Sequence, residues 1–196
     1  MTFKDLLAYC KASLAGYISI IIFVIWAIYP LFSSSSISFT IPAMIKMGAL
    51  YLPNYNSIWR IIFSTFVVAN LWQLLLIIIT LLLFLHHGYD LFSNTEFIFS
   101  LLAANIISNI IIKHINTTSY FGYGPTAGLI ALAALLFCSS TQGEYQNEIL
   151  QAIGESIAIL IIACLIQFSW TKLITGLVIG LLCGAASIII RSKLTI

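Results

Sequence analysis

The chain has 196 residues, of which 61% are hydrophobic and only 7% are charged, and its formal net charge is +2. About a quarter of the residues of a soluble globular protein are charged, so this composition excludes a soluble globule and predicts a polytopic membrane protein. The few basic residues are scattered along the chain, which argues against binding to nucleic acid.

Long apolar runs predict six membrane-spanning helices, since a span needs about 20 apolar residues. The predicted spans are about 15–33, 69–86, 96–114, 122–140, 149–168 and 171–190. The connections between them are short, apart from the first. We therefore expect an all-α, six-helix transmembrane bundle that forms a single domain over residues 1–196.

The first loop, 34–68, is mixed in composition, with prolines and polar groups among its apolar residues. This pattern predicts an interfacial segment that does not span. Trp59 and Arg60 suit the headgroup layer, because each combines an apolar body with a polar tip.

Basic residues are divided evenly between the two predicted faces, with Lys172, at the start of the last predicted span, counted on the face opposite the termini. The N-terminal pair, Lys4 and Lys11, usually dominates such a count, so the termini are expected in the cytosol. A transporter would place charged residues at the membrane midplane. Glu155, however, falls near the end of its predicted span, which argues against transport.

The four cysteines are dispersed and form no Cys-x-x-Cys pair. Paired cysteines at short spacing would indicate a metal site or a redox couple. We therefore expect neither a metal nor a cofactor.

The stretch GPTAG, residues 124–128, reads as Gly-x-Thr-x-Gly and differs by one residue type from the Gly-x-Ser-x-Gly pattern that presents a nucleophile. A hydroxyl needs an adjacent base within hydrogen-bond reach. His86 and His87 are predicted at the opposite membrane face. His114 is predicted on the correct face, but its loop has no carboxylate to orient the ring. No catalytic residue is expected, and Thr126 is expected to cap its helix or to satisfy another backbone group.

The last predicted span contains GLVIGLLCG, with Gly176, Gly180 and Gly184 spaced by four residues. Such a stripe clears one helix face so that another helix backbone can approach closely. Because a six-helix bundle offers neighbours, packing within the chain is expected rather than dimerisation.

Several amides are predicted at membrane depth, where lipid offers no hydrogen-bonding partner. They are Asn70, Gln73, Asn105, Asn109 and Gln167. One interpretation is hydrogen bonding between helices, at about 0.6 kcal/mol apiece. The other is a hydrated groove that binds a poorly hydrophobic span of a client protein.

Taken together, these features resemble the rhomboid superfamily over about residues 51–184. The shared features are the six spans, Trp-Arg in the long first loop, a glycine-rich start to the fourth span and glycines at four-residue spacing in the sixth. The residues that carry the resemblance are Trp59, Arg60, Gly122, Gly124, Pro125, Thr126, Gly128, Gly176, Gly180 and Gly184. The resemblance implies structural roles for them.

Active rhomboids carry histidines and an asparagine at the start of the second span, a serine at the start of the fourth and a histidine ahead of the sixth-helix glycines. By spacing, these positions fall on Val68, Gln73, Ile77, Thr126 or Ala127, and Leu173. None holds the expected residue, so the resemblance implies a pseudoprotease.

The sequence is most similar to the rhomboid-like subunit of the fungal Dsc membrane ubiquitin ligase and to rhomboid-like proteins with a ubiquitin-associated domain; Derlins are more distant. The resemblance implies a multi-pass adaptor of the endoplasmic reticulum or Golgi that binds transmembrane clients, or scaffolds a ubiquitin ligase and its AAA ATPase, in protein degradation. The alternatives are an intramembrane protease that uses Thr126 and a passive structural subunit of a membrane complex.

Overall fold

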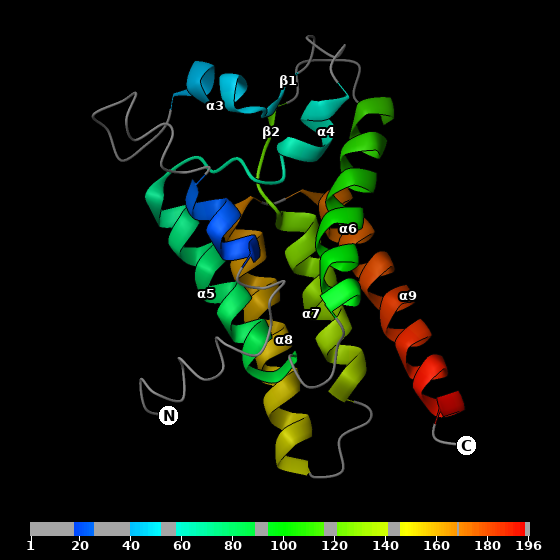
Figure 1. Ribbon diagram of the computed structural model, residues 1–196. Helices are drawn as coiled ribbons and strands as arrows, with labels where there is room; N and C mark the ends of the chain where they lie inside the picture. The colour runs from blue at the N-terminus through cyan, green and yellow to red at the C-terminus, as the bar shows by residue number, and fades with distance from the viewer. Residues whose placement is uncertain are drawn as a thin grey trace.

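The computed structural model describes residues 18–25, 40–51, 58–88, 94–115, 121–140, 146–167 and 169–194. These residues are mostly helical (Figure 1). The short elements are α3 (Ile41–Met47), α4 (Trp59–Phe63) and the two-residue strands β1 (Leu50–Tyr51) and β2 (Phe121–Gly122). The long helices are α5 (Leu71–Gly88), α6 (Asn94–Ile115), α7 (Thr126–Ser140), α8 (Gln146–Ile166) and α9 (Trp170–Leu194).

Three of the described helices contain segments long and apolar enough to cross a membrane: Thr95–Ile115, Ile149–Ile166 and Trp170–Ile189. The apolar parts of α5 and α7, Leu71–Leu85 and Thr126–Cys138, are shorter. The helical fold and its membrane character are therefore supported, but the count of six spans is not confirmed. Of the predicted first span, only the helical residues 18–25 are described.

Helix α7 begins at Thr126, later than the predicted span of about 122–140. Gly122 pairs with Leu50 in the small antiparallel sheet instead of entering a helix. Gly124 has a positive φ of 80°. This backbone conformation costs free energy for residues other than glycine, and it is not helical, so the helix begins only after it. Pro125 then lies directly before the first helical residue, where its missing N–H costs nothing.

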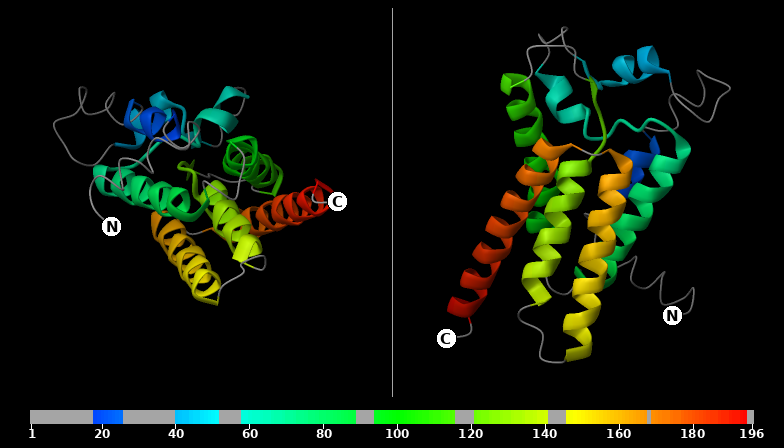
Figure 2. Two further views of the ribbon diagram at one scale, coloured as in Figure 1. Left: turned by 60° about the horizontal axis from the view of Figure 1, so that its bottom comes forward. Right: turned by 180° about the vertical axis from the view of Figure 1, so that it is seen from behind.

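The bundle is organised around α7, which packs most extensively against α9 and α8 and also contacts α6 and α5. Figure 2, left, shows α7 in the middle of these neighbours, and the view from behind shows it between α8 and α9. All its residues from Thr126 to Leu136 are buried. Eight of the eleven residues in this buried stretch are alanine or leucine, which favour helix formation, and Thr126 is its one polar residue.

Glycines bring two neighbouring helices against α7. A Cβ at Gly176 would lie 2.5 Å from the carbonyl oxygen of Ala127, and one at Gly180 would overlap the carbonyl of Ala131. On the other side, a Cβ at Gly128 would overlap the carbonyl of Leu101 in α6. The glycine stripe of α9 is thus used for packing within the chain, as expected.

Helices α3 and α4 and the β1–β2 pair form a cap over the end of the bundle at which α7 begins (Figure 1). Arg60 Nη1 donates hydrogen bonds to the carbonyl oxygens of Ile45, at 2.5 Å, and Ala49, at 3.1 Å. The Trp59 ring lies against Gly48, which ends α3 with a φ of 109°. These contacts tie α4 to α3, so the Trp-Arg pair has a structural role in the first loop.

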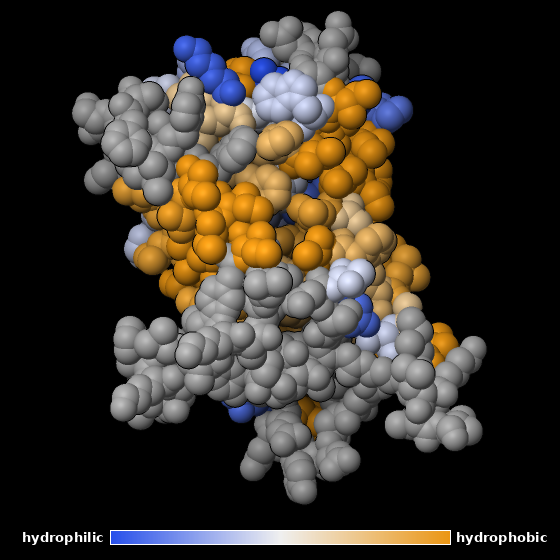
Figure 3. All heavy atoms as spheres, in the orientation of Figure 1, coloured by the Kyte–Doolittle hydropathy of each residue, from blue (hydrophilic) through white to orange (hydrophobic). Residues whose placement is uncertain are grey.

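Apolar side chains dominate the middle of the face shown in Figure 3, and hydrophilic residues lie toward its cap end. Two tryptophans lie in the first turns of helices that start at that end. Trp72 in α5 is 67% exposed and Trp170 in α9 is 68% exposed. Tryptophans are enriched at the membrane–water interface, so we expect this end of the bundle at headgroup depth.

Replacing Gly180 by alanine is expected to destabilise the protein by about 1–3 kcal/mol, because the added methyl group forces α9 away from α7. Gly154 in α8 provides a matched control, since a Cβ there meets nothing within 4 Å. Gly154→Ala should be neutral, or stabilising by up to about 1 kcal/mol through helix propensity. Thermal unfolding of both variants in mild detergent tests this, and equal effects would contradict the assigned packing.

Replacing Arg60 by glutamine should loosen the cap, because both of its hydrogen bonds to backbone carbonyls are lost. Chymotrypsin cleavage within residues 40–63, followed by mass spectrometry, should become severalfold faster. Lys46→Gln, which alters an exposed cation in α3, is the control and should leave the rate unchanged. An unchanged rate for Arg60→Gln would show that this arginine does not hold the cap.

Candidate functional site

Polar residues gather beneath the cap, around the turn that leads into α7. This polar layer consists of Ser64, Gln73, Asn109, Tyr123, Thr126, Gln167 and Lys172. Tyr123 and Gln167 are half-buried and the others are buried. The layer joins the start of α5, the end of α6, the start of α7 and the connection between α8 and α9.

Thr126 is 1% exposed, and its hydroxyl has no hydrogen-bond partner among the described residues. It is the first residue of α7, and its side chain neither caps the helix nor bonds to another described backbone group, contrary to the expectation from the sequence. The reason is that the chain turns at Gly124 and Pro125, one position earlier than a capping threonine requires. Thr126 is therefore a buried hydroxyl with unused hydrogen-bonding capacity.

No base is hydrogen-bonded to Thr126 in the described part of the chain. His114 is exposed near the end of α6, and its Nδ1 lies 2.8 Å from the carbonyl oxygen of Ile110. His86 and His87 belong to the last turn of α5, and their side chains lie outside the described residues. The pair of Thr126 and His114 considered from the sequence is thus not assembled in this conformation.

Lys172 is the residue of this layer that was not among the candidate site residues predicted from the sequence. It lies near the start of α9, within the predicted span, and is only 1% exposed. Its Nζ donates hydrogen bonds to the carbonyl oxygen of Tyr123, at 3.0 Å, and to Gln167 Oε1. A single lysine within the apolar run WTKLITGLV is the signal that would have found it, because ionisable residues inside spans are usually functional.

The charge state of the Tyr123 phenol bears on the environment of Lys172. Burial raises the pKa of its phenol above the usual value, because the charged form is poorly solvated. The phenol is therefore neutral at physiological pH, and Tyr123 contributes no negative charge to the layer.

Two of the predicted polar residues begin α5. Asn70 Oδ1 accepts a hydrogen bond from the Gln73 backbone N–H at 2.7 Å, and Gln73 Oε1 accepts one from the Ala69 N–H at 2.5 Å. This reciprocal arrangement satisfies backbone donors at the helix start. Gln73 Nε2, however, has no partner among the described residues and lies 3.3 Å from the position a Cβ would take on Gly124.

The two asparagines of α6 differ in what they join. Asn109 Nδ2 donates to the carbonyl oxygen of Ile61, at 3.0 Å, and to Ser64 Oγ, at 2.9 Å. Asn105 Nδ2 donates to Leu101 O of its own helix, at 2.8 Å. Asn109 therefore ties α6 to the cap. Asn109 thus forms a bond between elements of the kind that one interpretation expected, whereas the Asn105 bond stays within α6.

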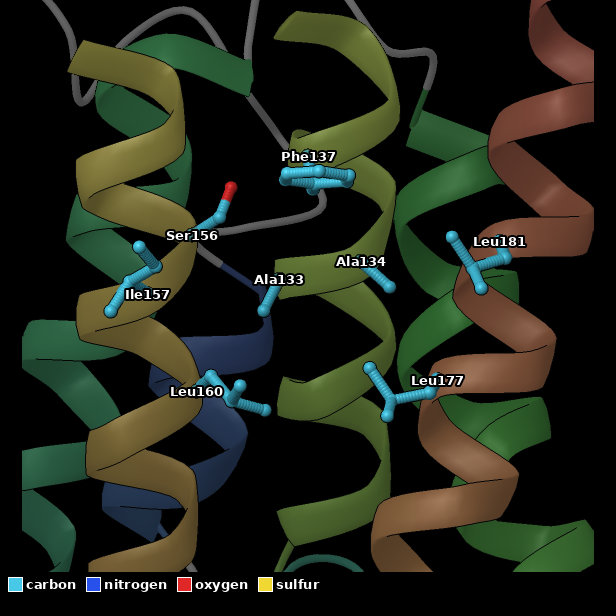
Figure 4. Close-up of a pocket in the computed structure, with 8 residues that line it drawn as sticks. All are labelled: Ala133, Ala134, Phe137, Ser156, Ile157, Leu160, Leu177 and Leu181. Carbon is cyan, nitrogen blue, oxygen red and sulfur yellow. The ribbon is translucent and has the colours of Figure 1, made fainter. Parts of the chain in front are cut away.

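A separate, apolar groove runs between α8 and α9 across the outer face of α7, with a volume of about 350 Å³ (Figure 4). It is lined by Ala133, Ala134, Phe137, Ser156, Ile157, Leu160, Leu177 and Leu181. Members of this lining recur at four-residue spacing on each helix, so the groove follows the helix axes. The Ser156 hydroxyl donates a hydrogen bond to Ala152 O at 2.7 Å. The one polar side chain of the lining therefore needs no hydrogen-bond acceptor from a molecule bound in the groove.

The groove opens to the outside of the bundle, because three of its lining side chains are strongly exposed. Phe137 is 47%, Ile157 51% and Leu181 46% exposed. Figure 2, left, shows α8 and α9 projecting to either side of α7. In a membrane, this groove faces lipid or another transmembrane helix.

No protein-family model, curated protein or solved structure matches the chain. The resemblance to the rhomboid superfamily therefore rests on the sequence features alone and remains a hypothesis. Among the described residues, no three His, Cys, Asp or Glu side chains are grouped so as to hold a metal ion.

Asn109→Leu should cost about 1 kcal/mol more stability than Asn105→Leu, since only Asn109 bonds to the cap. The loss should be accompanied by faster proteolysis of the cap. Parallel thermal unfolding and proteolysis of the two variants check this, and each variant is the other's control. Equal losses would mean that the bonds from Asn109 to Ile61 and Ser64 contribute nothing.

Proposed function

We propose that this protein is a non-catalytic membrane adaptor that binds a transmembrane helix of another protein in the groove between α8 and α9. The observation that carries the proposal is the separation of these two helices. Each packs on α7, and between them they leave an apolar groove that is open toward the membrane.

The lining of the groove supports a helix as its occupant. Its floor is formed by the small side chains Ala133 and Ala134, and its walls carry leucines from both flanking helices. Transmembrane helices associate through close van der Waals packing, which small residues permit. Because the groove follows the helix axes, side chains of a bound helix at four-residue spacing would fit between Leu160 and Leu177.

The chemistry at the start of α7 supports a role without catalysis. The Thr126 hydroxyl is buried, and no described base lies within hydrogen-bonding reach of it. A hydroxyl without an activating base is a poor nucleophile at its ordinary pKa. The alternative of a protease that uses Thr126 therefore gains no support from the geometry.

The resemblance to inactive rhomboid-like proteins supports the type of adaptor that we propose. It implies a client with a transmembrane segment, and as further partners a membrane ubiquitin ligase and an AAA ATPase. On this proposal the protein acts in quality control at the endoplasmic reticulum or Golgi. A passive subunit would need no accessible groove, and the groove is what favours client binding over it.

The proposal can be tested with a photo-crosslinking amino acid placed at Leu181, in the groove, and at Ile110, on α6. The two positions are matched in exposure, at 46% and 40%, and both are apolar, but only Leu181 lines the groove. After irradiation of native membranes, adducts at Leu181 should be severalfold more abundant and should map by mass spectrometry to transmembrane segments of other proteins.

Adducts of Leu181 with lipid alone would contradict the proposal. Adducts with a second copy of this chain would show that the groove serves self-association and not client binding. Equal labelling at Ile110 and Leu181 would mean that the groove has no preference over the general lipid-facing surface.

A further inference from the structure

The turn before α7 brings together a buried cation and two buried groups that have unused hydrogen-bonding capacity. The Lys172 ammonium binds the backbone of Tyr123, and the free Gln73 Nε2 lies against Gly124. The free hydroxyl of Thr126 follows two residues later. All three side chains belong to residues that are at least nine-tenths buried. Buried polar groups without partners in a native structure call for an explanation, and an unseen bound group is one.

We propose that this turn binds the phosphate of an anionic phospholipid headgroup, with Lys172, Gln73 and Thr126 as its ligands. This site lies in the polar layer, apart from the apolar groove, and the inference does not depend on the proposed adaptor function.

Charge is the first argument. The acceptors that Lys172 contacts, Tyr123 O and Gln167 Oε1, are both neutral. The acidic residues whose side chains are described lie elsewhere: Glu96 in the first turn of α6, away from the cap, and Glu155 in the middle of α8. A buried ammonium is costly unless an opposite charge accompanies it. The missing negative charge is therefore expected from a bound molecule.

Donor chemistry is the second argument. An ammonium offers three N–H donors, and the two hydrogen bonds of Lys172 leave one donor unused. The Gln73 amide nitrogen and the Thr126 hydroxyl add further donors. The first N–H groups of α7, a helix of 15 residues, have no partner within the helix, and its N-terminus favours an anion. Together these groups match the several acceptor oxygens of a phosphate.

Depth selects a lipid as the source of that phosphate. Gln73 directly follows Trp72, and Lys172 lies two residues after Trp170, the two strongly exposed tryptophans that mark the interface. The site is therefore level with the lipid headgroups. Tyr123 and Gln167, which contact Lys172, are only half-buried, so the residues that bind the ammonium reach the surface.

The test is native mass spectrometry of the full chain, purified in mild detergent and titrated separately with phosphatidylglycerol, phosphatidylcholine and inorganic phosphate. The wild type should retain one phosphatidylglycerol about tenfold more tightly than phosphatidylcholine. Lys172→Met and Thr126→Val should each weaken that retention, by about tenfold for the charged group and severalfold for the hydroxyl. Lys172→Arg keeps the charge and should retain the lipid.

Lys46→Met is the control, because it removes an exposed cation from the same end of the molecule and should not change retention. Equal losses for Lys46→Met and Lys172→Met would overturn the site in favour of general surface charge. Competition by inorganic phosphate at the same concentration as the lipid would overturn the lipid source. If Lys172→Met does not fold, unchanged lipid retention by Thr126→Val and Gln73→Met would overturn the proposal.

Discussion

The close approach of helix backbones to α7 is the constraint on which the rest of the structure depends. Gly176 and Gly180 let α9 reach the carbonyl oxygens of α7 on one side, and Gly128 lets α7 reach α6 on the other. Within a membrane no hydrophobic driving force holds helices together, so this dense packing supplies much of the association energy. It also fixes where the polar layer and the groove lie, because both are defined relative to α7.

The polar layer shows two ways in which a membrane protein handles buried polar groups. Asn70 and Asn109 are satisfied by bonds within the chain, and these bonds hold α5 and the cap in place. Lys172 is held by neutral acceptors, one of them the carbonyl oxygen of Tyr123, and Thr126, three residues after Tyr123, has unused hydrogen-bonding capacity. Satisfied groups rigidify a structure, whereas a buried charge without a counter-charge favours the binding of an anion. The first set supports the fold, and the second set forms the proposed binding site.

The groove and the polar layer lie at different depths and have different chemistry. The groove is apolar along the bodies of α7, α8 and α9 and suits a helix. The layer lies at the level of Trp72 and Trp170 and suits a charged headgroup. A lipid bound there would support the cap end of the bundle and leave the groove free for a client. The two proposals are therefore compatible, and each has its own experimental outcome.

The sequence by itself determined the membrane character, the approximate helices and the use of the α9 glycines in packing, because hydropathy and four-residue spacing are local properties of the chain. It also indicated structural roles for Trp59 and Arg60. Only the tertiary structure decided that α7 starts after a turn at Gly124, that Thr126 is buried without a partner, and that Lys172 is enclosed within the bundle. These outcomes depend on contacts between segments that are distant in the sequence. Strand pairing between Leu50 and Gly122 positions the turn at Gly124, and packing of α9 on α7 positions Lys172. The groove likewise results from the divergence of α8 and α9, which no local pattern encodes.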